Sequence, residues 1–408
     1  MTDMLPNRYY IFIPFVAYVV LLACHLHRAR SRSVLYVGLL LWYALSILAN
    51  RATGLYSEYP FHLGSMLYLA LGSVLFIYPF THFKHQTIQR ILPLRHFRIT
   101  AEVFILLNLA SIMVYLPDAI VHMLGNIGDM RTEVLETVAE QGNPNPVMTI
   151  LWLSQATFFI PLTLFFYSVV RRENGLLQVA LLIASFSKVV FHLSQVGRTG
   201  MLLWVLCFGY NYLVFRQFMP RQATRTMQKV ALGCLGSIVI VFAILSYQRF
   251  VDSHRSFGRL SPLCAVLDYY GHAPVRFDAF YEADYTEYYY GVHLFPLYYR
   301  ILNRVGLADL GSLSDMYDGI KEFGEDDWYY FATFLRELWY NFGPWGTLAC
   351  GLAFGFLVRR LCPRKKQPVS LKRIMLVYYL LTVPFMGLLS LSIACMDENY
   401  ALLLLLLV

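Results

Sequence analysis

The stretch from 148 to 170, MTILWLSQATFFIPLTLFFYSVV, decides the class of fold. It carries no charged side chain, and it exceeds the roughly 20 apolar residues that a helix needs to cross a bilayer. Apolar runs of the same kind occur along most of the chain. They lie at 9–25, 34–50, 61–80, 100–117, 148–170, 176–195, 200–216, 229–247, 341–361, 373–394 and 399–408. The pattern predicts an all-α polytopic membrane protein with about 11 transmembrane helices.

The bulk composition supports this interpretation. The chain is 58% hydrophobic and 14% charged, whereas soluble domains carry about 25% charged residues. A soluble protein of this composition would expose large apolar patches, which lipid can cover instead. The net charge of +8 comes from basic residues clustered in short loops, so we expect no nucleic-acid partner. The 7 cysteines are scattered without metal-ligand spacing, which predicts neither a zinc site nor a disulfide framework.

Lysine and arginine gather in alternate loops between the apolar runs. These basic loops are 26–33, 82–99, 171–174, 216–229 and 359–373. Basic loops tend to stay in the cytoplasm, so the N-terminus is predicted to lie outside. The predicted organisation is eight transmembrane helices within 1–247, a large extracytoplasmic loop at 248–340, and C-terminal transmembrane helices within 341–408.

The large outer segment has its own character. Residues 248–330 hold 13 acidic and 7 basic residues, together with 12 of the 30 tyrosines. Such an aromatic-rich composition is atypical of a disordered linker. We therefore expect this loop to be partly helical and to pack its short helices on the outer face of the membrane.

Ionisable residues inside predicted spans suggest function, because their burial in lipid is costly. Lys188, His192, Gln195 and Thr199 follow helical spacing and are predicted to share one face. Arg198 lies between two glycines at the outer end of this run, where the next helix begins. Arginine and helix amides there could bind one anion. The alternative is that this face packs inside the bundle and satisfies its own polar groups.

Three further residues in the outer segment are candidates. Arg249 follows the eighth run, where it is equally compatible with an anchor that reaches lipid headgroups. His293 and Arg300 are seven positions apart, which would place them on one face of a helix. Histidine is a suitable general base near neutral pH, although a lone histidine is also commonly structural.

The order of several motifs is similar to that of a known family. The motifs are Gly-Arg-Thr at 197–199, Tyr-Tyr-Gly at 289–291, Gly-x-His-x-Phe-Pro-Leu at 291–297 and Tyr-Asn-Phe-Gly-Pro-Trp-Gly at 340–346. Over roughly 185–361 the chain resembles the Wzy-type polymerases of O-antigen and capsule synthesis. This resemblance implies transfer of a growing glycan from one undecaprenyl pyrophosphate to another lipid-linked repeat unit. It further implies the outer face of a bacterial inner membrane, no metal or other cofactor, and a chain-length regulator as partner.

The resemblance also suggests roles for individual residues. Arg198 and Arg249 would clamp the pyrophosphate, with Arg300 as a third member, because guanidinium groups match phosphate oxygens in bidentate fashion. Arg276, Thr199 and Tyr290 are further candidates for contacts with pyrophosphate or sugar. His293 would accept the proton of the acceptor hydroxyl. Asp278 and Glu337 are substitutes for that base.

Other functions remain open at this point. An O-antigen ligase would use similar chemistry on a different acceptor. A repeat-unit flippase would need inward-facing polar groups in both halves of the bundle, whereas the polar residues here gather in the second half. Another class of polyprenyl-phosphate-sugar transferases carries an acidic pair in the first outer loop, where 51–60 offers only Glu58. A membrane scaffold without catalytic activity is a further alternative.

Overall fold

The computed structural model describes residues 5–28, 33–124, 146–251, 262–283, 288–307, 333–363 and 366–407. Within helix α11, Arg221–Val251, the side chains at 235, 238, 239 and 242–251 are not described. The chain divides into two compact units, which are treated separately below. Unit 1 comprises Met1–Thr87, Leu263–Lys365 and Tyr379–Asn399, and unit 2 comprises Ile88–Pro262, Lys366–Tyr378 and Tyr400–Val408.

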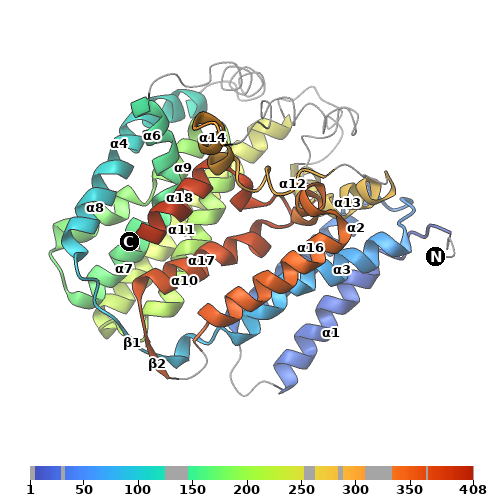
Figure 1. The fold of residues 1–408 in the computed structure, drawn as a ribbon, viewed down its shortest axis with the longest axis horizontal. Helices are drawn as coiled ribbons and strands as arrows, with labels where there is room; N and C mark the ends of the chain where they lie inside the picture. Colours follow the sequence, from blue (N-terminus) through green and yellow to red (C-terminus); the bar gives the residue numbers. More distant parts are fainter. Residues whose placement is uncertain are drawn as a thin grey trace. The chain divides into compact units, whose positions relative to one another are not determined.

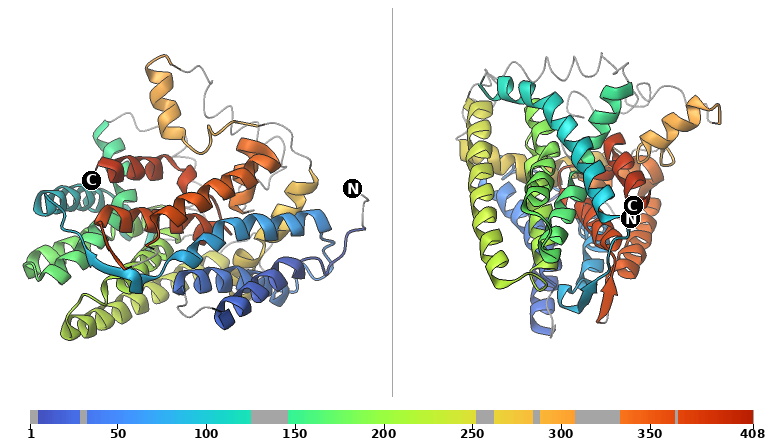
Figure 2. Two further views of the ribbon diagram at one scale, coloured as in Figure 1. Left: turned by 60° about the horizontal axis from the view of Figure 1, so that its bottom comes forward. Right: turned by 90° about the vertical axis from the view of Figure 1, so that its left-hand side faces the viewer.

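Unit 1 is built around three helices, α1, α2 and α3, of which α1 packs against both others (Figure 1). Short helices from the predicted outer loop belong to this unit. Among them, α14 projects from the unit (Figure 2), and its Tyr298 hydroxyl donates to the Asn399 carbonyl at 3.5 Å. Its elements are α1 Phe12–Arg28, α2 Val34–Ala52, α3 Leu63–Ile77, η1 Tyr78–His82, η2 His85–Thr87, α12 Pro262–Gly271, α13 Ala273–Glu282, α14 Pro296–Arg304, α16 Phe334–Leu361 and η5 Ser392–Ala394.

Unit 2 holds a second helical bundle in which α4 packs against α8 and α9, and α10 packs against α7 and α9. The helices α17 Leu371–Met386 and α18 Met396–Leu407 contribute to both units. The other elements of unit 2 are β1 Ile88–Ile91, α4 Phe97–Leu124, α6 Pro146–Ser154, η3 Gln155–Phe158, α7 Phe159–Arg171, α8 Gly175–Ala184, α9 Ser187–Ser194, α10 Thr199–Phe215, α11 Arg221–Val251 and β2 Gln367–Val369.

The prediction of an all-α chain is confirmed, but the predicted number of spans is not. Six described segments are long and apolar enough to cross a membrane, and two apolar helices of 10–17 residues are shorter. The six are Val34–Ala52, Leu63–Thr87, Phe97–Met123, Pro146–Arg171, Gly175–Ser194 and Phe334–Leu361. The run at 229–247 lies within α11. The last two runs fall on α17 and α18, of 16 and 12 residues.

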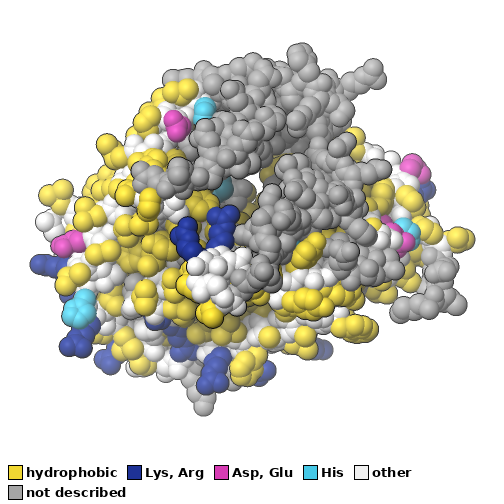
Figure 3. Space-filling model, turned by 45° about the horizontal axis from the view of Figure 1, so that its top comes forward, with side chains coloured by type: hydrophobic (Ala, Val, Ile, Leu, Met, Phe, Trp, Pro, Cys, Tyr) yellow, Lys and Arg dark blue, Asp and Glu magenta, His cyan; other side chains and the backbone are white. Residues whose placement is uncertain are grey.

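The surfaces of these helices suit contact with lipid. Leu106, Met113 and Phe356 expose 69%, 73% and 66% of their surface, and yellow hydrophobic side chains cover much of the described face in Figure 3. In water such continuous apolar exposure would be unfavourable. A hydrocarbon environment removes this cost.

One element departs from the all-α prediction. Strands β1 and β2 form a short parallel pair in unit 2, with Ile88 opposite Gln367 and Ile91 opposite Val369. The pair joins two of the basic loops, 82–99 and 359–373, which are far apart in sequence. The helical periodicity of the neighbouring runs gave no indication of this pairing.

The helix α16 reverses direction at Gly343. The rings of Phe334 and Phe354 both pack on Phe76 of α3, with centroid distances of 4.7 and 4.9 Å. A straight helix would separate two residues 20 positions apart by about 30 Å. Gly343 has φ 69° and ψ −178°, a backbone region essentially confined to glycine. The segment is therefore a hairpin of two helical arms, which we call the first arm, 334–342, and the second arm, 344–361.

The two arms of this hairpin run along α3 in opposite directions. Two residues of the first arm contact α3. Leu335 packs on Gly72, where an added Cβ atom would lie 2.9 Å from it, and the Trp339 ring lies 4.9 Å from that of Tyr68. In the second arm, Gly351 packs against Leu75. The predicted boundary between the outer loop and the C-terminal membrane helices, at 340–341, falls beside the turn. The first arm, which was predicted to belong to the loop, is thus buried against a membrane helix.

Candidate functional site

The candidate site lies at the end of unit 1 where α2 ends and α3 begins. We call this end the head; it comprises residues 53–62, helices α12 and α13, the segment 288–307 and the turn between the arms of α16. Helix α12 is held there by α2. Ser46 Oγ donates to the Tyr270 carbonyl at 2.9 Å, and Asn50 Nδ2 donates to the Gly271 carbonyl at 2.8 Å. A Cβ atom on Gly271 would lie 2.4 Å from the Asn50 nitrogen, so this contact requires glycine.

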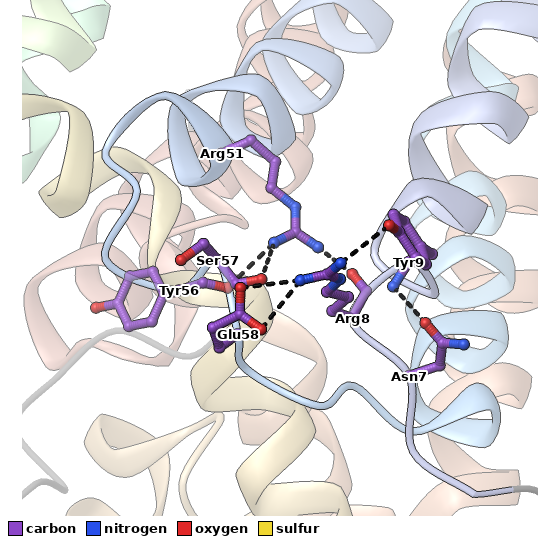
Figure 4. A network of polar contacts seen from close by, with 7 residues as sticks. All are labelled: Asn7, Arg8, Tyr9, Arg51, Tyr56, Ser57 and Glu58. Atoms are coloured by element: carbon purple, nitrogen blue, oxygen red, sulfur yellow. Dashed lines mark hydrogen bonds and ion pairs between the residues drawn. The ribbon is translucent and has the colours of Figure 1, made fainter.

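The loop 53–62 is fixed by arginine contacts, which Figure 4 shows. Arg51 donates to the carbonyls of Tyr56, at 3.1 Å, and Arg8. Arg8 in turn pairs with both oxygens of Glu58, at 2.9 and 3.0 Å. The Arg51 guanidinium also lies 5.8 Å from the Phe61 ring centroid. These contacts hold the backbone that leads into α3, and thereby position the residue that precedes it, His62.

Asp278 of α13 is a fully buried carboxylate at the start of α3. Its Oδ1 accepts from the His62 backbone N–H at 3.0 Å and from Ser65 Oγ. Its Oδ2 lies 3.1 Å from His62 Nδ1, and the His62 side chain is 29% exposed whereas that of Asp278 is 0% exposed. The carboxylate therefore caps the positive end of α3 and also orients an imidazole ring that remains accessible.

Three further polar side chains surround this pair. Glu282 Oε1 lies 3.4 Å from His62 Nδ1. Burial raises the pKa of Tyr59 far above its usual value, and the charge of Asp278, to which Tyr59 is hydrogen-bonded, raises it further, whereas the positive charge of Arg276 opposes the shift. Tyr59 is therefore a neutral hydrogen-bonding group at physiological pH.

Aromatic side chains form a continuous cluster beside the pair. Tyr68 of α3 stacks on Phe277 at 6.1 Å and contacts Trp339 of the first arm at 4.9 Å. Trp339 also contacts Tyr281 at 5.6 Å. The cluster joins α3, α13 and the first arm, so the polar pair is attached to a rigid frame.

The motifs at 289–297 and 340–346 lie against each other in the head. Asn341 Oδ1 accepts from the backbone N–H groups of Gly291, at 3.1 Å, and His293, at 3.2 Å. Its Nδ2 donates to the Glu337 carbonyl at 2.7 Å, and its own carbonyl accepts from Tyr290 N at 2.8 Å. Asn341 is completely buried. One side chain thus ties these two sequence motifs together.

The predicted helical face containing His293 and Arg300 is not formed. His293 lies in the turn before α14, which begins at Pro296 and contains Arg300. Gly291 has φ 92°, so the chain turns here rather than continuing a helix. His293 is 7% exposed, and this burial lowers its pKa to about 4. It is therefore neutral at physiological pH, but it is a weak base.

Burial of neutral His293 should make the protein sensitive to acid. Histidine in the unfolded chain has a pKa of about 6.5. Below that pH the unfolded state binds a proton on this residue, whereas the folded state does not until the pH approaches 4. Stability is thus fully present above about pH 6.5 and is lost toward pH 4, by about 3 kcal/mol. His293→Gln is expected to reduce the loss of apparent melting temperature between pH 7 and pH 5 in detergent. His27→Gln, at an exposed position of α1, should leave that loss unchanged; an equal effect of both variants would contradict the assignment.

The remaining predicted substitutes and contacts in unit 1 have distinct surroundings. Glu337 Oε2 accepts from Leu391 N at 2.8 Å, which gives this carboxylate a structural role. Tyr290 is 78% exposed, and Arg300 is exposed on α14. Arg276 of α13 is half-buried beside Tyr59. Of the predicted residues, Asp278 and Arg276 therefore both lie beside Tyr59 of the loop 53–62. The backbone N–H groups of His293 and Tyr290 both bond to Asn341.

The Gly-Arg-Thr motif lies in unit 2, in a tight turn between α9 and α10. Val196 has φ 55°, and α10 begins at Thr199. Lys188 and His192 share α9, but the predicted common face does not extend to Thr199, because the turn interrupts the helix. A Cβ atom on Gly200 would lie 2.4 Å from the Lys188 carbonyl oxygen. Arg198 is 7% exposed, so it is buried in the turn rather than displayed on a surface.

Arg249 lies on α11, also in unit 2, and its side chain is outside the described part of the structure. The geometry of the predicted pyrophosphate clamp therefore stays a prediction. Among the described residues, no group of three or more His, Cys, Asp or Glu side chains is arranged to hold a metal ion.

Sequence reasoning missed His62, Ser65 and Tyr59. His62 stands alone at the edge of an apolar run, and its partner Asp278 is distant in the chain, so no local spacing connects them. A usable signal did exist. The stretch Phe-His-Leu-Gly-Ser at 61–65 begins an apolar helix, and the first amides of a helix need hydrogen-bond acceptors. This signal could not have identified which carboxylate supplies such an acceptor.

Comparison with known proteins adds no assignment: no family model, no curated protein and no solved structure matches this chain.

Proposed function

We propose that the chain is a membrane glycosyltransferase that polymerises undecaprenyl-pyrophosphate-linked oligosaccharide repeat units at the outer face of the inner membrane. The observation that carries this proposal is the contact between the motifs at 289–297 and 340–346 through Asn341. These are two of the motifs on which the resemblance to Wzy-type polymerases rests. Their convergence is what a shared functional site requires.

The chemistry of the reaction agrees with the residues of the head. A glycosyl transfer needs a group that accepts the hydroxyl proton of the acceptor and positive groups that stabilise the departing pyrophosphate. The head combines a histidine on a buried carboxylate with aromatic side chains, next to helices that suit a lipid environment. In this proposal an acceptor hydroxyl of the glycan lies at the histidine, the sugar rings lie on the aromatic side chains, and the lipid lies along the helices.

Arg198 and Arg249 are proposed to bind the pyrophosphate leaving group. Arg198→Ala and Arg249→Ala should each reduce long glycan chains roughly 100-fold or more, since charge-stabilising donors contribute on that scale. Arg198→Lys and Arg249→Lys should also fail, because a point charge does not reproduce the guanidinium fork. The measurement is the ladder of glycan lengths on a gel, from cells that carry equal amounts of each variant in the membrane.

Arg221→Ala provides the matched control, as this arginine is exposed at the start of α11. Its ladder should be normal. Normal ladders from the Arg198 and Arg249 variants as well would show that these arginines do not form the clamp.

A further inference from the structure

The imidazole of His62 is set up to accept a proton at one defined atom. Nδ1 lies 3.1 Å from Asp278 Oδ2 and 3.4 Å from Glu282 Oε1. Ionised carboxylates only accept hydrogen bonds, so the proton of neutral His62 resides on Nδ1 and the lone pair on Nε2. In the part of the chain that the structure describes, Nε2 has no hydrogen-bond partner, and the side chain is partly exposed.

Asp278 also gives the His62 ring a fixed partner on its Nδ1 side. Asp278 is buried and held by the His62 N–H and Ser65, so its position is fixed before any substrate binds. A carboxylate on the far nitrogen of a histidine fixes the ring orientation and stabilises the imidazolium without taking the proton itself. This arrangement combines an imidazole ring of fixed orientation with an accessible basic atom, Nε2.

We propose that His62 is the general base that accepts the proton of the acceptor sugar hydroxyl, and that Asp278 is its positioning residue. This inference rests on the proposed glycosyl transfer. The acceptor oxygen forms a bond to the anomeric carbon of the donor glycan, and the bond from that carbon to the pyrophosphate oxygen breaks. The electron pair of the broken bond leaves with the pyrophosphate, and the hydroxyl proton moves to Nε2 of His62.

His62 fits this role better than the other histidine of the head. His293 is 7% exposed, and the low pKa of about 4 that burial gives it makes its neutral form a poor proton acceptor. Its backbone N–H also donates to Asn341 Oδ1, which gives the residue a structural place in the turn. The groups that face His62 are Asp278, Glu282 and Ser65, with Tyr59 and Arg276 beside them.

A purely structural role for the same contacts predicts a different outcome. If Asp278 serves only to cap α3, its loss should lower stability and leave the pH dependence of any remaining activity unchanged. If it serves His62, its loss should also move that dependence. The pH profile therefore separates the two roles.

The test uses the full chain in membranes or detergent with a lipid-linked repeat unit, and it follows initial rates of elongation across pH. His62→Asn keeps an N–H that can reach Asp278 but has no base. Its rate should fall roughly 100-fold or more. The natural chain should slow toward acid pH, which is the acid limb of its profile, and the residual rate of His62→Asn should lack this limb. Imidazole in solution should restore part of the rate to His62→Ala. Asp278→Asn should be slower and should shift the acid limb to lower pH, whereas Glu282→Gln, at a 44% exposed side chain, should change the rate only a few-fold.

The outcomes separate this inference from the proposed function. An active natural chain whose His62→Asn variant keeps the same rate and pH profile contradicts the assignment of the base alone. An acid limb that stays in place in Asp278→Asn contradicts the positioning role. A natural chain that elongates no lipid-linked glycan overturns the proposed function, and the role of His62 with it. Failure of imidazole to restore any activity to well-folded His62→Ala also counts against a general base.

Discussion

Gly343→Ala is expected to melt roughly 5 °C or more below the natural chain and to lose activity. The backbone region that Gly343 occupies costs other residues about 1–3 kcal/mol. A Cβ atom there would also lie 3.0 Å from the Tyr288 ring. Because the two arms of α16 reverse at this residue, the strain falls on the turn that carries Asn341. Thermal unfolding in detergent measures the loss.

Gly54→Ala is the matched control for this prediction. Gly54 has a similar φ of 70°, but a Cβ atom on it would have nothing within 4 Å. The left-handed backbone alone costs about 1–2 kcal/mol, so a smaller fall in melting temperature is expected. If Gly343→Ala were no less stable than Gly54→Ala, the described turn would be wrong.

Asn341→Ala is expected to release the segment 288–295 from the first arm. The substitution removes the acceptor of two backbone N–H groups, those of Gly291 and His293, and the donor to the Glu337 carbonyl. Leaving buried polar groups unpaired costs about 1–3 kcal/mol each. Hydrogen exchange should therefore become faster at the Gly291 and His293 amides, and elongation of the glycan should fall sharply.

A second buried asparagine provides a comparison for Asn341. Asn211 in α10 also donates to a carbonyl four residues before it, that of Cys207, at 2.9 Å. It belongs to the other unit. Asn211→Ala should lower stability without changing exchange in 288–295. Unchanged exchange at Gly291 and His293 in Asn341→Ala would show that this side chain does not hold the two motifs together.

The sequence was a good guide to local structure and a poor one to contacts. Long charge-free runs such as 148–170 identify helices because lipid imposes a simple requirement on every residue. The turn at Gly343 was harder to predict from the sequence, because Gly-Pro also occurs in kinked but continuous helices. The reversal becomes evident only when Phe334 and Phe354 meet on Phe76.

The candidate site illustrates the same limit. Arg198 was selected because it lies between two glycines, and His293 because histidine suits a general base; both prove to be buried in turns. His62, whose partner and exposure suit proton transfer, depends on Asp278, which lies 216 positions away in the chain. Pairings over such a separation follow from how α13 packs on α3, which no local pattern encodes.

The glycan profile of a strain that lacks this chain tests the central claim most directly. A polymerase that joins repeat units at the outer face predicts that surface glycans shrink to a single repeat unit on their acceptor, and that the ladder returns when the natural chain is restored. Long lipid-linked chains that accumulate without transfer would indicate a ligase instead. Repeat units retained on the cytoplasmic side would indicate a transporter, and an unchanged ladder would contradict a role in polymerisation altogether.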